Sequence, residues 1–268
     1  MAATREIIFD RLVYSCAFEK HRGSEEFYPD HFLGFQLSGE THVFHDQDAT
    51  VIREHTVVLV KKNQLIRTIK YPSKSGKYSF IAITLDNETL QNYATENKIA
   101  VDSHYQGMQK LFFEPNEFLS SYFISLAPYI NKTKQATPKL ADIKVREAIE
   151  LLLDSNPDLK YVLFDFVKTY KIDLEEFMNK NYMFNVSVAS FARLTGRSIS
   201  AFKRDFVQTF RCSPKLWLKN KRLEEAYYLI KYKHQKPSSF YLNLGFENLS
   251  HFYASFKEKY GLTTSEVR

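Results

Sequence analysis

Cysteine, glycine and proline are all scarce in this 268-residue sequence. Its two cysteines, Cys16 and Cys212, lie far apart and outside any spaced cluster, so we expect neither a disulfide framework nor a cysteine-based zinc site. Eight glycines and eight prolines are too few for a collagen-like or low-complexity chain. No apolar run approaches the roughly 20 residues of a membrane helix, and Asp10 and Arg11 interrupt any signal-peptide core. A globular protein of a reducing cytoplasm, without a membrane partner, is therefore expected.

The charge of the chain is unevenly distributed. The formal net charge is +6. Residues 180–268 contain 16 Lys and Arg against 6 Asp and Glu, whereas residues 1–179 contain 21 and 25. A weakly acidic front joined to a strongly basic C-terminal part suggests a module there that binds a polyanion.

Short segments rich in β-branched and aromatic residues dominate the first hundred positions. They predict strands at 7–9, 12–18, 31–37, 41–44, 56–60, 64–69 and 78–85. Turn residues separate them, among them Arg22-Gly-Ser24 and Leu37-Ser-Gly-Glu40, of which the second predicts a tight hairpin because glycine adopts positive φ freely. Many short strands at near-regular spacing favour a small barrel or sandwich.

Helical periodicity replaces the strands after Leu85. Helices are expected at about 87–97, 115–130, 139–153 and from Asn156-Pro157 onward. Phe118, Tyr122 and Leu126 share one stripe of the second helix and are expected to be buried. Residues 115–167 contain more apolar side chains than one small barrel can cover. Either some of them cover the barrel, or the helices form a homodimer interface.

The last ninety residues predict two helix-turn-helix units. Ser187 begins a helix that Gly196 ends, and Ser198 begins an amphipathic helix that continues to Phe210. Ser213-Pro214 then begins a linker helix to Lys231. A shorter helix before Leu244-Gly245, followed by a helix over 249–260 capped by Asn248, forms the second unit. Trp217 is expected to be core, because its neighbours on the linker helix are apolar.

Four segments carry a resemblance to a known family. They are Phe191-Ala-Arg-Leu-Thr-Gly-Arg-Ser-Ile-Ser-Ala-Phe-Lys-Arg-Asp-Phe206, Ser213-Pro-Lys-Leu-Trp-Leu218, Arg222-Leu-Glu-Glu-Ala226 and Gly245-Phe-Glu-Asn-Leu-Ser-His-Phe252. In order and spacing they resemble the AraC/XylS family of transcriptional regulators, over about 173–268. The front part resembles the cupin-like regulatory domains of that family in layout. The resemblance implies an α+β protein: a regulatory and dimerisation domain at 1–170, with a small β-barrel (1–105) and helices (106–170), and an all-helical DNA-binding domain at 173–268.

The resemblance and the helix geometry also suggest which residues contact DNA. The family places a base-reading arginine at Arg204, and a guanidinium bonds guanine in bidentate fashion. The other exposed candidates for base contact are Ser200, Lys203, Ser250, His251 and Tyr253. Candidate phosphate contacts are Arg197, Ser198, Lys215, Lys219, Asn248 and Lys257.

The second unit departs from the family pattern. Tyr241 stands where the family has a small alanine, and Ala254 stands where an arginine commonly reads a base. We therefore expect base specificity to be concentrated in the first unit.

A metal site in the front domain is a competing hypothesis. The residues that invite it are His42, His45, Glu54 and His55. Because His42 and His45 are three positions apart, a strand would point them to opposite faces, so no metal is expected. Phe32, Phe35, Phe44 and Phe80 are expected in the barrel core, and alternate residues of the strands would line any pocket.

The sequence thus predicts a regulator that binds specific double-stranded DNA and acts as an activator, not an enzyme, with no cofactor. The expected partners are promoter DNA, RNA polymerase, a small-molecule effector and a second copy of the chain. Two alternatives remain open: a cupin-type metalloenzyme with a basic C-terminal domain, and a degenerate regulator that acts through protein contacts.

Overall fold

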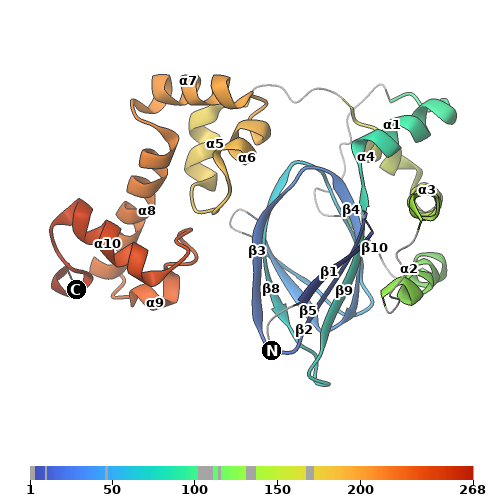
Figure 1. Cartoon of the computed structure of the whole chain (residues 1–268), viewed down its shortest axis with the longest axis horizontal. Helices are drawn as coiled ribbons and strands as arrows, with labels where there is room; N and C mark the ends of the chain where they lie inside the picture. Colours follow the sequence, from blue (N-terminus) through green and yellow to red (C-terminus); the bar gives the residue numbers. More distant parts are fainter. Residues whose placement is uncertain are drawn as a thin grey trace. The chain divides into compact units, whose positions relative to one another are not determined.

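A computed structural model describes residues 4–9, 11–45, 48–101, 111–113, 116–130, 137–166 and 172–267. The chain divides into two compact units, Met1–Val167 and Lys168–Arg268. The first contains strands and helices, and the described part of the second is helical (Figure 1). The predicted α+β class is therefore confirmed. No helix among the described residues is long and apolar enough to cross a membrane.

The strands of the first unit pair into two antiparallel sheets. Their bounds are β1 (Thr4–Phe9), β2 (Leu12–Ala17), β3 (His21–Tyr28), β4 (His31–Ser38), β5 (Glu40–His45), β6 (Asp48–Ile52), β7 (Val57–Val60), β8 (Gln64–Tyr71), β9 (Tyr78–Leu85) and β10 (Leu111–Phe113). The six-stranded sheet has the order β1-β2-β9-β4-β7-β10, and the four-stranded sheet has the order β3-β8-β5-β6. Within the described residues the strands form two opposed sheets rather than the closed barrel that the sequence suggested (Figure 1).

The predicted hairpin around Gly39 is wrong. β4 pairs with β7 and β9, whereas β5 pairs with β6 and β8, so this turn carries the chain from one sheet to the other. Gly39 has φ +75°, and a Cβ there would lie 2.3 Å from the carbonyl oxygen of Tyr71. The carboxylate of Glu54 accepts a hydrogen bond from the Gly39 amide at 2.7 Å. The glycine is needed for a close backbone approach between the sheets, not for a hairpin.

The turn predicted at Arg22-Gly-Ser24 lies inside β3. The register of β3 against β8 shifts between Arg22 and Glu25, which marks a bulge or irregularity. A glycine within a strand often marks such a bulge. The same residue types form turns and β-bulges, so the sequence pattern did not distinguish a turn from a bulge at Arg22-Gly-Ser24.

Helices cover one face of the six-stranded sheet (Figure 1). They are α1 (Asn87–Glu96), α2 (Glu117–Ile130), α3 (Pro138–Ser155), the 3-10 turn η1 (Pro157–Leu159) and α4 (Lys160–Leu163). Buried side chains of the sheet and of these helices form one core. Phe35 of β4 illustrates it, because its ring stacks on Phe123 of α2 with centroids 5.2 Å apart.

The buried stripe of α2 differs from the predicted one. Tyr122 and Leu126 are buried as expected, but the stripe begins at Leu119, and Phe118 is 67% exposed. In the apolar stretch that follows, Ile149, Leu152, Leu163 and Phe164 are buried in the core. Most of the stretch therefore covers the sheet. Phe118, Ile124 and Ile143 are the large apolar side chains that the described part of α2 and α3 leaves exposed.

The second unit contains α5 (Leu174–Asn181), α6 (Val188–Leu194), α7 (Ile199–Phe210), α8 (Pro214–Lys231), α9 (Pro237–Phe240), α10 (Leu249–Tyr260) and α11 (Thr264–Val267). The starts of five of these helices follow local capping rules. The capping side chains, each accepting a backbone N–H of the first turn, are Asp173, Ser187, Ser198, Ser213 and Asn248. The caps at Ser187, Ser198, Ser213 and Asn248 are ones that the sequence predicts.

Gly76 is a control for Gly39, because the two glycines have nearly the same φ. Gly76 has φ +76°, and no atom lies within 4 Å of a Cβ built there. Gly76→Ala should therefore lower the free energy of unfolding by about 1–2 kcal/mol, the cost of a left-handed alanine. Gly39→Ala adds a clash with backbone and should cost about 3 kcal/mol or more. Urea unfolding followed by fluorescence measures both, and equal losses would contradict this account of the turn.

Candidate nucleic-acid interface

The first helix-turn-helix unit consists of α6, a turn at Gly196 and α7 (Figure 1). Gly196 has φ +68°, and the preceding helix packs through Phe191 and Ala192, which are almost fully buried. On α7, Phe202 and Phe206 are fully buried one turn apart. Because a helix that buries one face presents the other, this packing leaves the opposite side of α7 to solvent. The residues exposed there include Ser200, Lys203, Arg204 and Gln208.

Aromatic side chains join α7 to the start of α8. The ring of Trp217 lies edge-on to Phe206 at 5.7 Å and 4.6 Å from the ring of Phe210. Trp217 of α8 thus packs on α7, but it is half-buried rather than part of the core as predicted. The arrangement fixes α7 on α8 through rigid rings.

The second unit packs along the rest of α8. Buried side chains of α8, α9 and α10 form one cluster, which includes Leu223, Ala226, Ile230, Phe240, Phe252 and Phe256. α9 has four residues and begins at Pro237, so the first helix of this unit is short. Tyr241 directly follows α9 and is half-buried against the cluster. The opposite side of α10 exposes Ser250, His251, Tyr253, Ala254 and Lys257.

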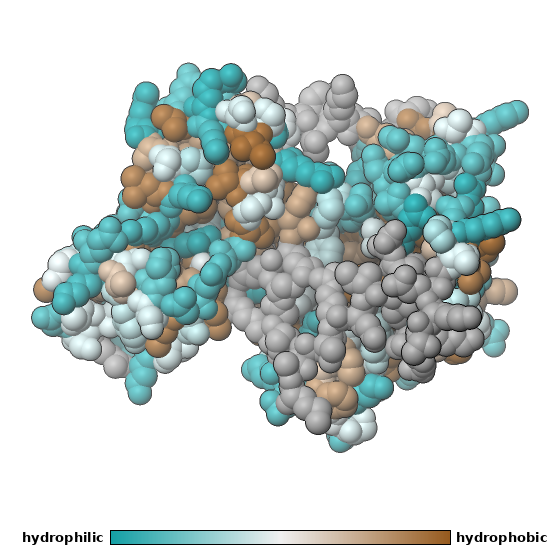
Figure 2. All heavy atoms as spheres, in the orientation of Figure 1, coloured by the Kyte–Doolittle hydropathy of each residue, from teal (hydrophilic) through white to brown (hydrophobic). Residues whose placement is uncertain are grey.

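Ion pairs brace α10 against α8. Lys219 lies 2.7 Å from the carboxylate of Glu258. Lys259 donates to Glu224 and to the carbonyl oxygen of Asn220, each at 2.9 Å. Both pairs are partly exposed, so each contributes little to stability on its own. On the face drawn in Figure 2, hydrophilic residues are spread over the region of α8 and α10.

The predicted base-contacting residues are accessible. Arg204 is the most informative: its side chain is 73% exposed and lies 3.3 Å from Asp205, an exposed contact that DNA can replace. Ser200 and Lys203 lie on the same side of α7. His251 and Tyr253 are exposed on α10, next to the exposed Ala254.

Five of the six predicted phosphate contacts fall into three groups. Lys215 and Lys257 have exposed side chains. Ser198 and Asn248 use their side chains as helix caps, accepting from Ala201 and His251 at 3.2 and 2.8 Å; the neighbouring helix-start amides are the groups that a phosphate would meet there. Lys219 is paired with Glu258, so a phosphate would have to compete with this carboxylate.

Arg197 requires a correction. Its side chain is 9% exposed and lies 3.1 Å from Asp205. The guanidinium also donates to the carbonyl oxygens of Ile172 at 3.0 Å and Thr195 at 2.8 Å. A side chain that is buried and bonded in this way supports the turn between α6 and α7. The structure thus gives Arg197 a supporting role at this turn, with its donors directed to protein atoms rather than to a phosphate.

Arg222 of α8 begins one of the segments that carry the resemblance, but the sequence predicted no role for it. It donates to the carbonyl oxygens of Tyr182, Phe184 and Gly245 at 2.8, 2.9 and 3.0 Å. Its partners are main-chain carbonyl oxygens remote in sequence, and a residue pattern does not predict such contacts.

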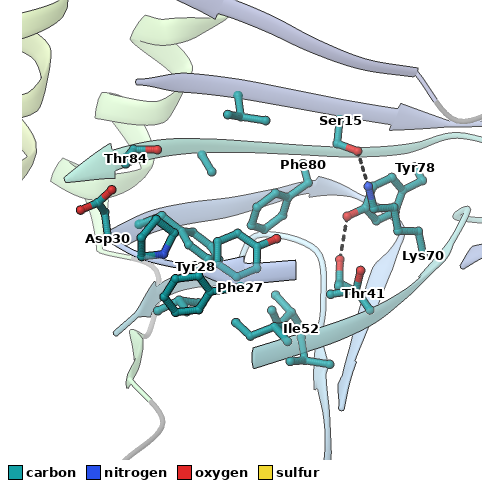
Figure 3. Close-up of a pocket in the computed structure, with 18 residues that line it drawn as sticks. Ser15, Phe27, Tyr28, Asp30, Thr41, Ile52, Lys70, Tyr78, Phe80 and Thr84 are labelled. Atoms are coloured by element: carbon teal, nitrogen blue, oxygen red, sulfur yellow. Dashed lines mark hydrogen bonds between the residues drawn. The ribbon is translucent and has the colours of Figure 1, made fainter. Parts of the chain in front are cut away.

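A second candidate site is a cavity of about 360 Å³ between the two sheets of the first unit (Figure 3). Alternate residues of the strands line it, as expected; examples are Ile66, Thr68 and Lys70 of β8. Phe32 and Phe80 also line the cavity, so their placement in a solid barrel core is wrong. Phe35, on the other face of β4, does belong to the core.

Polar groups lie at both ends of this cavity (Figure 3). Asp30 and Thr84 are at one end, and a hydrogen-bonded group that includes Lys70 and Tyr78 is at the other. Lys70 donates to the hydroxyl of Ser15 at 2.5 Å. The hydroxyls of Tyr78 and Thr41 are 2.8 Å apart, and Thr41 donates to the side chain of Gln36 at 2.7 Å. Burial raises the pKa of Tyr78 to about 12, so the phenol keeps its proton at neutral pH and remains a donor.

The residues behind the metal hypothesis have other partners. Glu54 accepts from the Gly39 amide, and His42 Nε2 lies 2.8 Å from the carboxylate of Glu40. The ring of His55 lies 6.2 Å from that of Phe35, and the side chain of His45 is outside the described part. Across the described ranges, no three His, Cys, Asp or Glu side chains are grouped to hold a metal ion.

Comparisons with known proteins match both units. A family described as "Helix-turn-helix domain" matches residues 191–268, and one described as "ExsA N-terminal regulatory domain" matches residues 31–162. The chain is 28% identical over 133 residues to the HTH-type transcriptional regulator ExsA of Pseudomonas aeruginosa, covering 49% of this chain and 48% of ExsA. The chain is therefore homologous to transcriptional regulators of the AraC family. The predicted resemblance is confirmed.

Other relatives match over smaller or more divergent parts. The virulence regulon transcriptional activator VirF of Yersinia enterocolitica is 28% identical over 95 residues, 35% of each protein. The chain thus spans about half or less of these relatives. Among solved structures, ToxT from Vibrio cholerae is 13% identical with a TM-score of 0.43, covering 96% of this chain and 97% of ToxT. A probable AraC family regulator from Rhodopseudomonas palustris is 27% identical with a TM-score of 0.31, covering 35% and 89%.

Two arginines beside the same carboxylate test the correction for Arg197. Arg197→Ala removes a buried donor from Asp205 and from two carbonyl oxygens, and should lower the free energy of unfolding by about 2–3 kcal/mol. Arg204→Ala removes an exposed contact and should change it by less than about 0.5 kcal/mol. Urea unfolding of the full chain compares them. A larger loss for Arg204→Ala would contradict the assignment.

Proposed function

We propose that this protein is a transcription regulator that binds specific double-stranded DNA through α7 and α10. Helix-turn-helix proteins place a recognition helix in the major groove, and two such helices contact one side of DNA when they are about 34 Å apart. The observation that carries the proposal is on α7: one side is buried by Phe202 and Phe206, and the other exposes Ser200, Lys203 and Arg204.

The two units have different roles in this proposal. Arg204 reads a guanine in the first half-site, with Ser200 and Lys203 beside it. α10 presents Ser250, His251 and Tyr253 and no arginine, so it contributes less base discrimination. The amides at Ser198 and Asn248, with Lys215, Lys219 and Lys257, hold phosphates.

The first unit is proposed as a regulatory and dimerisation domain, residues 1–170, that controls the DNA-binding domain, residues 173–268. The exposed Phe118, Ile124 and Ile143 of α2 and α3 support a contact with a second copy of the chain. The relative VirF is named a transcriptional activator; we infer activation here too, with RNA polymerase as a partner in the cytoplasm. The protein is inferred not to be an enzyme.

The cavity between the sheets supports a small-molecule effector site. Its volume of about 360 Å³ lies in the range of small-molecule pockets, about 300–1,000 Å³. Most of its lining is apolar, while Lys70, Ser15 and Tyr78 bring donors to one end. Such a site suits an amphipathic molecule whose apolar body fills the cavity and whose acidic group meets Lys70.

The two alternatives differ from this proposal in what they bind. A cupin-type metalloenzyme would purify with stoichiometric iron or zinc and would not bind DNA specifically. A regulator that acts through protein contacts would show equal, weak affinity for all duplexes. Binding of the full chain to a random pool of duplexes, with metal analysis of the same preparation, separates the three.

Two exposed basic residues test the division of roles on DNA. Arg204→Ala should lose about 1–3 kcal/mol of discrimination at one base pair. Lys215→Ala should weaken binding to all duplexes about equally and reduce the slope of log affinity against log salt by about one. Titrations at several salt concentrations, on the selected duplex and on random DNA, measure both effects. If both variants lose the same affinity on the selected duplex and on random DNA, the assignment of roles is wrong.

A matched lysine pair tests the effector site. Decanoate, as an acidic amphipathic probe, should raise the melting temperature of the wild type, because a ligand that binds the folded state stabilises it. Lys70→Met should lose most of this shift, whereas Lys77→Met, on the exposed turn before β9, should retain it. Decanol serves as the uncharged control and should give a smaller shift. An equal shift for Lys70→Met and wild type would exclude Lys70 as the partner of the acidic group.

A further inference from the structure

We propose that Arg222 is a positioning residue that fixes the distance between the two recognition helices, so that the protein accepts one spacing between the two halves of its DNA site. The proposal rests on the proposed function, because it concerns how the same interface is held. It assigns to Arg222 no contact with DNA.

The guanidinium of Arg222 joins two segments that are remote in sequence. Nε and Nη2 donate to the carbonyl oxygens of Tyr182 and Phe184, which follow α5. Nη1 donates to the carbonyl oxygen of Gly245, in the turn that leads to α10. One planar group thus links the end of α5 to the turn of the second helix-turn-helix unit, and α8 carries it between them.

The turn at Gly245 is built for this close contact. Gly245 has φ +77°, and a Cβ there would lie 2.7 Å from Cζ of Arg222 and 2.8 Å from the carbonyl oxygen of Met183. Leu244 and Phe246, on either side, are buried in the core of the second unit. The backbone of the turn therefore lies directly against the guanidinium, and its position depends on it.

α5 in turn is attached to the first helix-turn-helix unit. Phe177 of α5 packs edge-on against Phe191 of α6, with centroids 6.3 Å apart. Arg197 holds the carbonyl oxygen of Ile172, just before α5, at 3.0 Å. α5 is thus fixed to the first unit near its start by Arg197 and to the second unit at its end by Arg222. α5 therefore provides a second link between the two helix-turn-helix units, in addition to α8.

Two connections restrain a motion more tightly than one. The buried cluster of α8, α9 and α10 holds the second unit on α8, and the partly exposed pairs of Lys219 and Lys259 add little to this. The clamp at Arg222 adds a connection through α5, which restrains the remaining tilt of the second unit about α8. Lysine does not replace it, because a single ammonium lacks the planar fork that reaches three carbonyl oxygens at once. A fixed distance makes the second half-site an intramolecular contact at high effective concentration.

The test uses the full chain and the duplex that the wild type selects from a random pool. Spacer variants of this duplex lengthen or shorten the distance between the two protected halves by one or two base pairs, and a further duplex retains the Arg204-dependent half alone. The wild type should lose at least tenfold in affinity when the spacer changes by two base pairs. Arg222→Gln should bind the original duplex about tenfold more weakly, bind the half-site duplex as the wild type does, and lose less than threefold on the changed spacers.

Two further variants complete the design. Arg222→Lys keeps the charge and should resemble Arg222→Gln. Lys231→Gln, a basic-to-amide change at the exposed end of the same helix, should retain the wild-type spacer profile.

The outcomes separate the possible failures. Equal losses for Arg222→Gln on the full and half-site duplexes, with an unchanged spacer profile, would overturn the proposal and leave Arg222 a general stabilising residue. If Arg222→Gln does not fold, the wild type decides: a wild type that tolerates both spacer changes would also overturn it. Failure to select any duplex would instead contradict the proposed function.

Discussion

Burial of one aromatic face on each recognition helix is the constraint on which the DNA-binding unit depends. Phe202 and Phe206 fill the interior beneath α7, and Phe252 and Phe256 do the same beneath α10. Each pair lies one helical turn apart, so it fixes which side of its helix faces solvent. Both helices pack on α8, a single element of 18 residues, about 27 Å long. Exposure of Arg204 and orientation of α10 are consequences of the same core.

In the first unit, the strands likewise bury one face and present the other. Side chains alternate across each strand, so one face of the six-stranded sheet packs against α1–α4 and the other faces the cavity. Gly34 of β4 shows how closely the wall of the cavity is packed, because a Cβ there would lie 2.3 Å from the ring of Phe80. An effector that enters this cavity contacts both sheets. In the proposed mechanism, these contacts change the conformational equilibrium of the first unit.

The sequence predicted best what is local. Helix starts at Ser187, Ser198 and Asn248 depend on a side chain and an amide three residues on, so the pattern locates them. Strand pairing depends on residues far apart, and there the prediction failed. β3, β6 and β10 were missed, the last of them within the range 106–170 expected to be helical, and the Gly39 turn joins two sheets. For the site, Arg204 could be placed from periodicity and resemblance. The burial of Arg197 and the partners of Arg222 could not, because both bind main-chain carbonyl oxygens brought near by the fold.

Hydroxyl-radical footprinting of the full chain on its selected duplex tests the central claim most directly. If α7 and α10 are held on α8 as one unit, two protected patches should appear on the same face of the DNA, about 10 base pairs apart. A single patch, or two patches on opposite faces, would contradict the account.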